Sequence, residues 1–198
     1  IPTAVWVSKT FFGYDIREKG SGNSGATNSF RVMGKKAGSF VMLIDALKGW
    51  LAANIAFLLI YMEAIPQENF VRFQLLYGVL AVVGHVFPVF AKFKGGKGVA
   101  TLLGMTLAAD LNVALICLGV FIVVLFLSKY VSLGSMLAAL CFPLTLLLIP
   151  KFNTGGPILI VFGFILFFLV VVTHKKNIRR LIAGEENKAN IRLRRPRD

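Results

Sequence analysis

Six long apolar runs dominate the sequence and restrict what the chain can fold into. They cover residues 1–13, 37–62, 70–91, 98–128, 132–150 and 157–173, and most charged residues lie between them. About 20 apolar residues are needed to cross the hydrocarbon core of a bilayer as a helix. Because backbone groups in lipid must find partners within the protein, each run is expected to be helical. The sequence therefore predicts an all-α, polytopic integral membrane protein.

The first run is shorter than a membrane span needs, and the fourth is longer. We expect the first helix to be truncated in this chain, because residues 1–13 fall short of about 20. Residues 98–128 would form a helix about 46 Å long at about 1.5 Å per residue, beyond a hydrocarbon core of about 30 Å. Asp110 and Asn112 interrupt this run. It is either one steeply tilted helix or two short helices, 98–109 and 111–128.

The charge of the loops favours two helices in this region. Segments 14–36, 92–97 and 174–198 would then all lie on one side, and the last carries nine Lys and Arg residues. The positive-inside rule places such segments in the cytoplasm. We therefore predict about seven spans with a cytoplasmic C-terminus. Residues 98–109 are too short to cross alone, so this helix is tilted, lies in thinned bilayer or is shielded by protein.

The charge balance indicates anionic partners at a membrane surface. Lys and Arg number 22 against 9 Asp and Glu, which gives a net charge of +13. Basic segments adjoin the spans, so anionic lipid or an anionic substrate is favoured over nucleic acid. Cys117 and Cys141 lie in apolar runs and do not have the spacing of metal ligands. We also expect no metal, no cofactor and no obligate protein partner. The segments between spans are too short to fold alone, so residues 1–198 are interpreted as one membrane-embedded domain.

The first polar segment, residues 20–31 (GSGNSGATNSFR), is rich in glycine and neutral donors. Its G-x-G-x-x-G spacing matches a dinucleotide fingerprint, but that motif requires a βαβ unit and here follows a membrane helix. Glycines let backbone N–H groups converge on an oxyanion, and a guanidinium suits phosphate. The segment is either an anion-binding loop or a flexible loop with incidental polar residues. The candidate binding residues are Ser21, Gly22, Asn23, Gly25, Thr27, Asn28 and Arg31.

The second segment, residues 84–101 (GHVFPVFAKFKGGKGVAT), places three glycines around Lys97 at the start of the next predicted helix. It fails the P-loop pattern, because Ala91 and Gly98 stand where that motif needs Gly and Ser or Thr. Backbone N–H groups, the helix dipole and an ammonium still converge there, which predicts a phosphate site. Positive-inside charge alone explains the lysines but not the glycines. The candidates are His85, Lys94, Gly95, Gly96, Lys97 and Gly98, with His85 alternatively a hydrogen-bonded interface histidine.

The third segment covers residues 174–187, and its apolar positions Ile178, Leu181 and Ile182 have helical spacing. This spacing predicts an amphipathic helix along the membrane interface. His174 and Asn177 share one face of that helix and are candidates for the site, whereas the neighbouring basic residues suit anionic lipid. Asp45 and Lys48 lie three residues apart inside the second span. Ionisable residues in a membrane are costly, so this pair either braces the helix or contacts substrate.

Taken together, the three segments resemble the PlsY family of bacterial membrane glycerol-3-phosphate acyltransferases. The likeness covers essentially the whole chain, and DALKG at residues 45–49 is also typical. It implies transfer of a fatty acyl group from acyl-phosphate to the 1-hydroxyl of sn-glycerol 3-phosphate, at the cytoplasmic face of the bacterial inner membrane. The products are lysophosphatidic acid and phosphate. Because acyl-phosphate is already an activated anhydride, direct transfer without an acyl-enzyme is expected.

The resemblance also implies roles for individual residues. Ser21 and Arg31 match the functional serine and arginine of the first family motif, and the three glycines around Lys97 match those implicated in binding glycerol phosphate. Ser24 departs from the family, which usually has an apolar residue or proline there. The residues expected to be catalytic are Ser21, Arg31, Lys97, His174 and Asn177, and those expected to be structural are Asp45, Lys48 and Glu186.

The attacking hydroxyl must lose a proton, and the sequence offers few bases. His85, His174 and the phosphates of the substrates are the candidates. An imidazole among anionic phosphates is expected to be charged. We therefore predict that a substrate phosphate takes the proton and that His174 binds and orients.

Overall fold

The computed structural model describes residues 1–153 and 155–189, and within these residues the chain is helical without strands. This confirms the predicted all-α class. The elements are α1 (Thr3–Phe12), η1 (Ile16–Glu18), α2 (Ala26–Val32), α3 (Gly34–Tyr61), η2 (Gln67–Asn69), α4 (Phe70–Val86), η3 (Val89–Ala91), α5 (Val99–Ala109), α6 (Leu111–Ser128), α7 (Val131–Leu148), η4 (Pro150–Phe152), α8 (Gly156–Thr173) and α9 (Lys175–Ile182).

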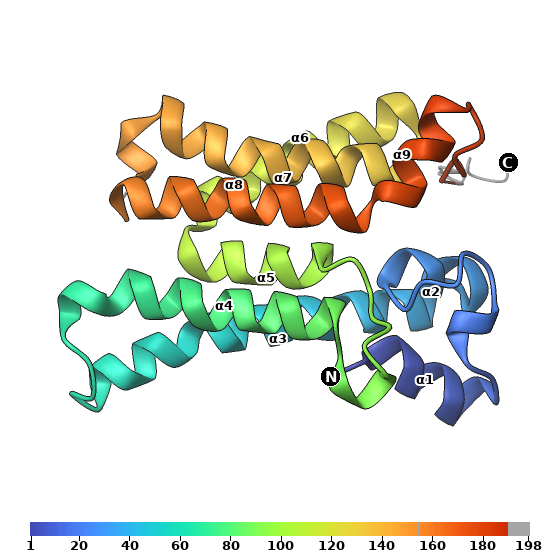
Figure 1. Cartoon of the computed structure of the whole chain (residues 1–198), viewed down its shortest axis with the longest axis horizontal. Coiled ribbons are helices and arrows are strands. Elements are labelled where there is room, and N and C mark those ends of the chain that lie inside the picture. Colours follow the sequence, from blue (N-terminus) through green and yellow to red (C-terminus); the bar gives the residue numbers. More distant parts are fainter. Residues whose placement is uncertain (154, 190–198) are drawn as a thin grey trace, which may run out of the picture.

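The long helices run roughly parallel to one another in two groups, with the short helix α5 between them (Figure 1). One group contains α3 and α4, and the other contains α6, α7 and α8. The short helices α1, α2 and α9 gather at one end of the bundle, where the loop that leads into α5 also lies (Figure 1). All three polar segments of the sequence therefore meet at the same end.

Among the residues that the structure describes, five helices are long and apolar enough to cross a membrane: α3, α4 with its flanking turns, α6, α7 and α8. The run 98–128 is two helices, as the loop charges predict, and the single tilted helix is excluded. Asp110 adopts an extended conformation between α5 and α6, and its Oδ1 accepts hydrogen bonds from the N–H groups of Asn112 and Val113. A side-chain cap of this kind starts a new helix.

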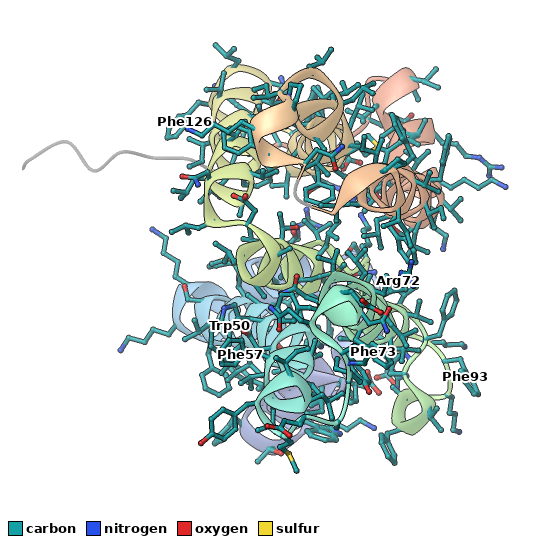
Figure 2. All side chains as sticks on the ribbon, turned by 90° about the vertical axis from the view of Figure 1, so that its left-hand side faces the viewer. Trp50, Phe57, Arg72, Phe73, Phe93 and Phe126 are labelled. Atoms are coloured by element: carbon teal, nitrogen blue, oxygen red, sulfur yellow. The ribbon has the colours of Figure 1, made fainter. Side chains whose placement is uncertain are left out.

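The outer surface of the bundle is apolar. Large hydrophobic side chains project outward all around it (Figure 2), and Trp50, Phe57 and Phe126 are among the exposed ones. In water such a surface drives association, whereas in a bilayer the lipid tails cover it. The structure thus agrees with an integral membrane protein.

Helix α5 packs against α3 with almost no space between the two backbones. A Cβ added at Gly104 of α5 would lie 1.8 Å from the carbonyl oxygen of Ala46, and one added at Gly49 of α3 would lie 2.0 Å from that of Thr101. Small residues allow this close approach of membrane helices. The contact matters for the site, because α5 begins two residues after Lys97.

Candidate functional site

The first polar segment folds into a tight loop that the Asn28 side chain holds in shape. Asn28 is 1% exposed. Its Oδ1 accepts the N–H of Ser21 at 2.9 Å, and its Nδ2 donates to the carbonyls of Ile16 and Lys19. The buried amide, which was expected to bind an anion, thus holds the turn instead, and the carbonyls of Ile16 and Lys19 that it contacts also accept the N–H groups of Lys19 and Gly22. Gly20, with φ +59°, and Gly22, with φ +73°, allow the left-handed turn.

The remaining candidates of the first segment surround this turn. Asn23 Oδ1 accepts the N–H of Gly25 at 2.9 Å, so that N–H is also used within the loop. The side chains of Ser21, Thr27 and Arg31 are exposed at the surface of the segment. A Cβ added at Gly25 would lie 3.9 Å from the Cα of Gly96, which brings the first and second glycine-rich segments into contact.

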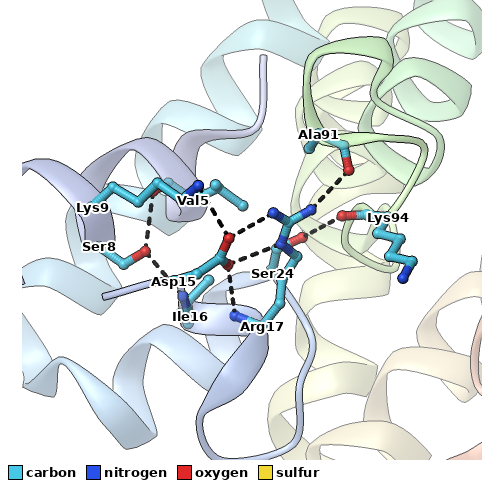
Figure 3. A network of polar contacts seen from close by, with 9 residues as sticks. All are labelled: Val5, Ser8, Lys9, Asp15, Ile16, Arg17, Ser24, Ala91 and Lys94. Carbon is cyan, nitrogen blue, oxygen red and sulfur yellow. Dashed lines mark hydrogen bonds and ion pairs between the residues drawn. The ribbon is translucent and has the colours of Figure 1, made fainter. Parts of the chain in front are cut away.

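An ion-pair network ties these two segments together (Figure 3). Arg17 pairs with Asp15 and donates from Nη1 to the Ala91 carbonyl at 2.8 Å. The Arg17 guanidinium lowers the pKa of the Asp15 carboxyl well below its usual range, and Lys9 adds a second cation at 3.3 Å. Ser24, which departs from the family pattern, lies against the Lys94 carbonyl. Sequence reasoning missed Arg17 and Asp15, because nothing local shows that Arg17 reaches Ala91.

The glycines of the second segment serve close packing on the end of α4. The N–H groups of Gly95 and Gly96 donate to the carbonyls of Val86 and His85, both at 3.2 Å, so they are not free to bind an oxyanion, contrary to expectation. The reason is that the loop lies directly on α4: a Cβ added at Gly95 would lie 2.0 Å from the His85 carbonyl oxygen. Gly98, with φ +82°, precedes α5, whose first turn leaves N–H groups without intrahelical partners.

Lys97 joins the second segment to the third. Its Nζ donates to Oδ1 of Asn177, and its carbonyl accepts from Thr173 at 3.3 Å. Burial lowers the pKa of Lys97 to about 8, and the charges of Arg180 and Arg31 act in the same direction. Arg31 of the first segment therefore lies within electrostatic reach of Lys97, and positive charge from all three segments converges here.

The Glu186 carboxylate holds the third segment in place through hydrogen bonds to α7 and α9. Its Oε1 accepts hydrogen bonds from Ser132 and Asn177, and its Oε2 accepts from Nε of Arg180 at 2.7 Å. Burial alone would raise the pKa of this carboxyl, but these hydrogen bonds outweigh it, and the net pKa is lowered. Sequence reasoning missed Arg180 and Ser132. The acidic pair Glu185 and Glu186 was the one available signal for Arg180, and Ser132 on α7 left none.

His174 occupies the junction of α8 and α9 and is 2% exposed. Its Nδ1 lies 2.7 Å from the Val170 carbonyl oxygen, which can only accept, so Nδ1 carries the proton. Burial and the nearby Lys97 lower the pKa of His174 to about 4. This lowered pKa favours the neutral ring, and the charged imidazole expected among substrate phosphates stays a prediction. Its neutral ring leaves Nε2 as a hydrogen-bond acceptor.

A second buried cluster lies on the other side of the glycine-rich loop. Lys48 Nζ contacts Asp45 Oδ1 at 2.6 Å and His85 Nδ1 at 2.7 Å, and Thr3 also donates to Asp45 Oδ1. Asp45 and Lys48 therefore form an internal ion pair that braces α3 against α1 and α4. Within residues 1–153 and 155–189, no group of three or more His, Cys, Asp or Glu side chains is placed to hold a metal.

A model of the family described as glycerol-3-phosphate acyltransferase matches residues 1–184. The chain belongs to this family. The glycerol-3-phosphate acyltransferase of Salinibacter ruber is 45% identical over 197 residues, covering 94% of this chain and 86% of the relative. That of Chlorobium phaeobacteroides (strain BS1) is 42% identical, covering 95% and 90%.

Two solved structures of this acyltransferase family share the fold. One is PlsY, an integral membrane glycerol 3-phosphate acyltransferase, in its glycerol 3-phosphate form. The TM-score is 0.80 at 34% identity, covering 96% of this chain and 90% of that one. The other is PlsY in its lysophosphatidic acid form, with a TM-score of 0.77 at 36% identity, covering 94% and 87%. Both confirm the resemblance that the three segments carry.

Proposed function

We propose that the chain transfers a fatty acyl group from acyl-phosphate to the 1-hydroxyl of sn-glycerol 3-phosphate, which yields lysophosphatidic acid and inorganic phosphate. The observation that carries this proposal is the convergence of Arg31, Lys97 and Arg180 at the junction of the three segments, braced by Asn177 and Glu186. Each substrate brings a phosphate, and a cationic cluster at one end of a membrane bundle suits phosphates that enter from the water and from the lipid.

Phosphate binding is assigned to Lys97 and Arg31. A phosphate oxygen next to Lys97 favours its ammonium form, which the apolar surroundings otherwise disfavour. Asn177 orients the Lys97 side chain, and Glu186 orients Asn177. The N–H groups of the first turn of α5 add donors aligned with the helix dipole. The second phosphate is assigned to the exposed loop residues Ser21, Gly22 and Thr27 and to the half-buried Asn23.

Transfer is direct in this proposal. The hydroxyl oxygen attacks the acyl carbonyl carbon, the bond between that carbon and the phosphate oxygen breaks, and phosphate leaves with the electron pair. A serine nucleophile needs an adjacent base, and the Ser21 side chain contacts no histidine within the described residues. Holding the two substrates in line supplies much of the rate acceleration, and the cations stabilise the departing phosphate.

The proton of the hydroxyl passes to a phosphate of the substrates. The lone pair on Nε2 of neutral His174 accepts a hydrogen bond and orients the hydroxyl, but a ring with a pKa of about 4 is a weak base. Phosphate, whose second ionisation lies near 6, is the stronger base. The rate is therefore expected to rise with pH through about 6.

The topology proposal adds α1 and α5 to the five long helices, which makes about seven spans. The helix α5 has only 11 residues, and its position between the two helix groups shields its ends from lipid (Figure 1). The basic segments at the site end favour a cytoplasmic location of the site and the C-terminus, in the bacterial inner membrane.

The test is turnover by the purified protein in detergent. Acyl-phosphate and glycerol 3-phosphate should give lysophosphatidic acid and phosphate without coenzyme A or a carrier protein. Arg31→Ala and Lys97→Ala should each lower kcat/KM by about 10²-fold, since hydrogen bonds to charged groups contribute about 1.5–3 kcal/mol. Lys175→Ala, on the exposed face of α9, serves as the matched control and should keep full activity. Equal activity of all three variants would overturn the assignment, and no product from the parent protein would overturn the reaction.

A further inference from the structure

The buried cluster of Asp45, Lys48 and His85 carries charges that the proposed phosphate site does not use. Asp45 is 1% exposed and His85 is 7% exposed. The cluster connects α3 and α4 directly beneath the loop that contains Gly95 and Gly96. Burial of two charges and an imidazole is costly unless each of them is hydrogen-bonded. The hydrogen bonds within the cluster therefore indicate which atoms carry protons and which group each side chain positions.

The ammonium group of Lys48 has three donors, and three acceptors surround it. They are Asp45 Oδ1 at 2.6 Å, the Ile1 carbonyl oxygen at 3.0 Å and His85 Nδ1 at 2.7 Å. An ammonium has no lone pair, so His85 Nδ1 must be the acceptor in the third contact. The Asp45 carboxylate at 2.6 Å favours the ammonium form of Lys48. With Nδ1 as the acceptor, His85 carries its proton on Nε2.

The protonated nitrogen of His85 faces the glycine-rich loop. A Cβ added at Gly96 would lie 2.1 Å from His85 Nε2, closer than to either neighbouring ring carbon. Within the part of the chain that the structure describes, Nε2 has no hydrogen-bond partner. Gly25 of the first segment also approaches Gly96, since a Cβ added at Gly25 would lie 3.9 Å from the Gly96 Cα. The unpartnered N–H thus lies where the two glycine-rich loops meet.

We propose that His85 Nε2–H donates a hydrogen bond to a phosphate oxygen of a bound substrate, and that Lys48, held by Asp45, is the positioning residue that keeps His85 in this tautomer. The proposal rests on the phosphoryl substrates of the proposed function and adds a side-chain donor to those of Arg31 and Lys97. The tautomer decides whether the contact is attractive or repulsive, because a protonated Nε2 donates to the phosphate oxygen, whereas an unprotonated Nε2 would direct its lone pair at the anion.

The chain has two histidines, and the proposal gives them opposite tautomers. His85 should carry its proton on Nε2, whereas the Val170 carbonyl holds the proton of His174 on Nδ1. Nitrogen NMR of protein labelled with ¹⁵N-histidine, in micelles, distinguishes protonated from unprotonated ring nitrogens, and the His174→Gln variant assigns the two rings. Inorganic phosphate or glycerol 3-phosphate should shift the Nε2–H signal of His85. A proton on Nδ1 of His85, or no shift with either ligand, would overturn the proposal.

Two substitutions of His85 form a matched pair. The amide of Gln reaches the position of Nε2 and keeps a donor there, whereas the amide of Asn reaches only that of Nδ1. His85→Gln should keep KM within about threefold of the parent, and His85→Asn should raise KM by about 10- to 100-fold. The substrate whose KM rises, glycerol 3-phosphate or acyl-phosphate, is the one that His85 contacts. Equal KM values in both variants, for both substrates, would refute the contact.

Lys48→Met tests the positioning role. Without the ammonium, the Nδ1–H tautomer of His85 should become populated, and KM should rise as in His85→Asn. A Lys48→Met variant that retains a single Nε2–H tautomer would show that Lys48 does not set it. If this variant fails to fold, the NMR of the parent protein still decides the proposal. Lack of turnover in the parent would refute the proposed reaction but leave the tautomer and phosphate titration as separate results.

Discussion

Replacing Gly104 by alanine should damage both stability and activity, because it forces α5 away from α3. The added Cβ would lie 1.8 Å from the Ala46 carbonyl oxygen and close to the Trp50 nitrogen. Both are backbone atoms of a helix and have no rotamer to change. Real Cβ contacts are essentially never shorter than 3.0 Å, so the two helices must separate by about 1.2 Å at this point.

The size of the effect follows from the packing. Overpacking of a well-packed core typically costs about 1–3 kcal/mol, and a rigid helix backbone places Gly104→Ala at the upper end. For a chain of this size, about 3 kcal/mol corresponds to a fall in Tm of about 6–12 °C. A displacement of about 1 Å at positioned groups costs about 10²-fold in rate. Helix α5 begins just after Lys97, so kcat/KM should fall by that order.

The assay is thermal unfolding in detergent, followed by circular dichroism, together with turnover at a temperature where both proteins are folded. Gly119→Ala is the matched control, because Gly119 lies in α6 with no atom within 4 Å of the added Cβ. Alanine is the better helix former by about 1 kcal/mol, so this variant should be unchanged or slightly stabilised. A Gly104→Ala protein as stable and as active as Gly119→Ala would refute the close packing of α3 and α5.

Three further outcomes are expected. The pKa of Lys97 is lowered to about 8, so its ammonium form is lost as pH rises through that value, and kcat/KM should fall above pH about 8. Lys97→Arg should remove this fall. A pH profile of kcat/KM that is the same in the parent protein and in Lys97→Arg would contradict the role of the Lys97 ammonium. His174→Gln should keep measurable turnover. The folded-state pKa of His174 is lowered from 6.5 to about 4, so the unfolded state binds a proton that the folded state does not, and the free energy of unfolding falls as pH falls through this range. The decrease in Tm between pH 6.5 and 4 should therefore be smaller in His174→Gln than in the parent protein. An equal decrease in both proteins would show that the His174 imidazole is not its cause. A cysteine in place of the exposed Asn187 should react with an impermeant thiol reagent only after cells are permeabilised, and labelling of intact cells would reverse the proposed orientation.

The helical class, the break at Asp110 and the grouping of three polar segments at one end could all be predicted from the sequence. Each depends on local properties. A run of apolar residues in lipid can only be a helix, an aspartate in such a run caps a new one, and an even number of crossings returns the chain to the same side. The ion pair of Asp45 and Lys48 was also within reach, since residues three apart share a helix face.

Contacts between distant segments decided what the functional residues do. The sequence identifies Asn28, Gly95 and Gly96 as polar or flexible, but their hydrogen-bonding groups are used by carbonyls of the loop and of α4. It identifies His174 as a titratable group, but burial beside Lys97 makes it neutral. Burial, the sign of a neighbouring charge and the choice of a hydrogen-bond partner are properties of the packed bundle. For this reason the sequence alone determined that the three polar segments meet at one end of the bundle, and only the tertiary structure decided which of their N–H groups and lone pairs remain available to a substrate.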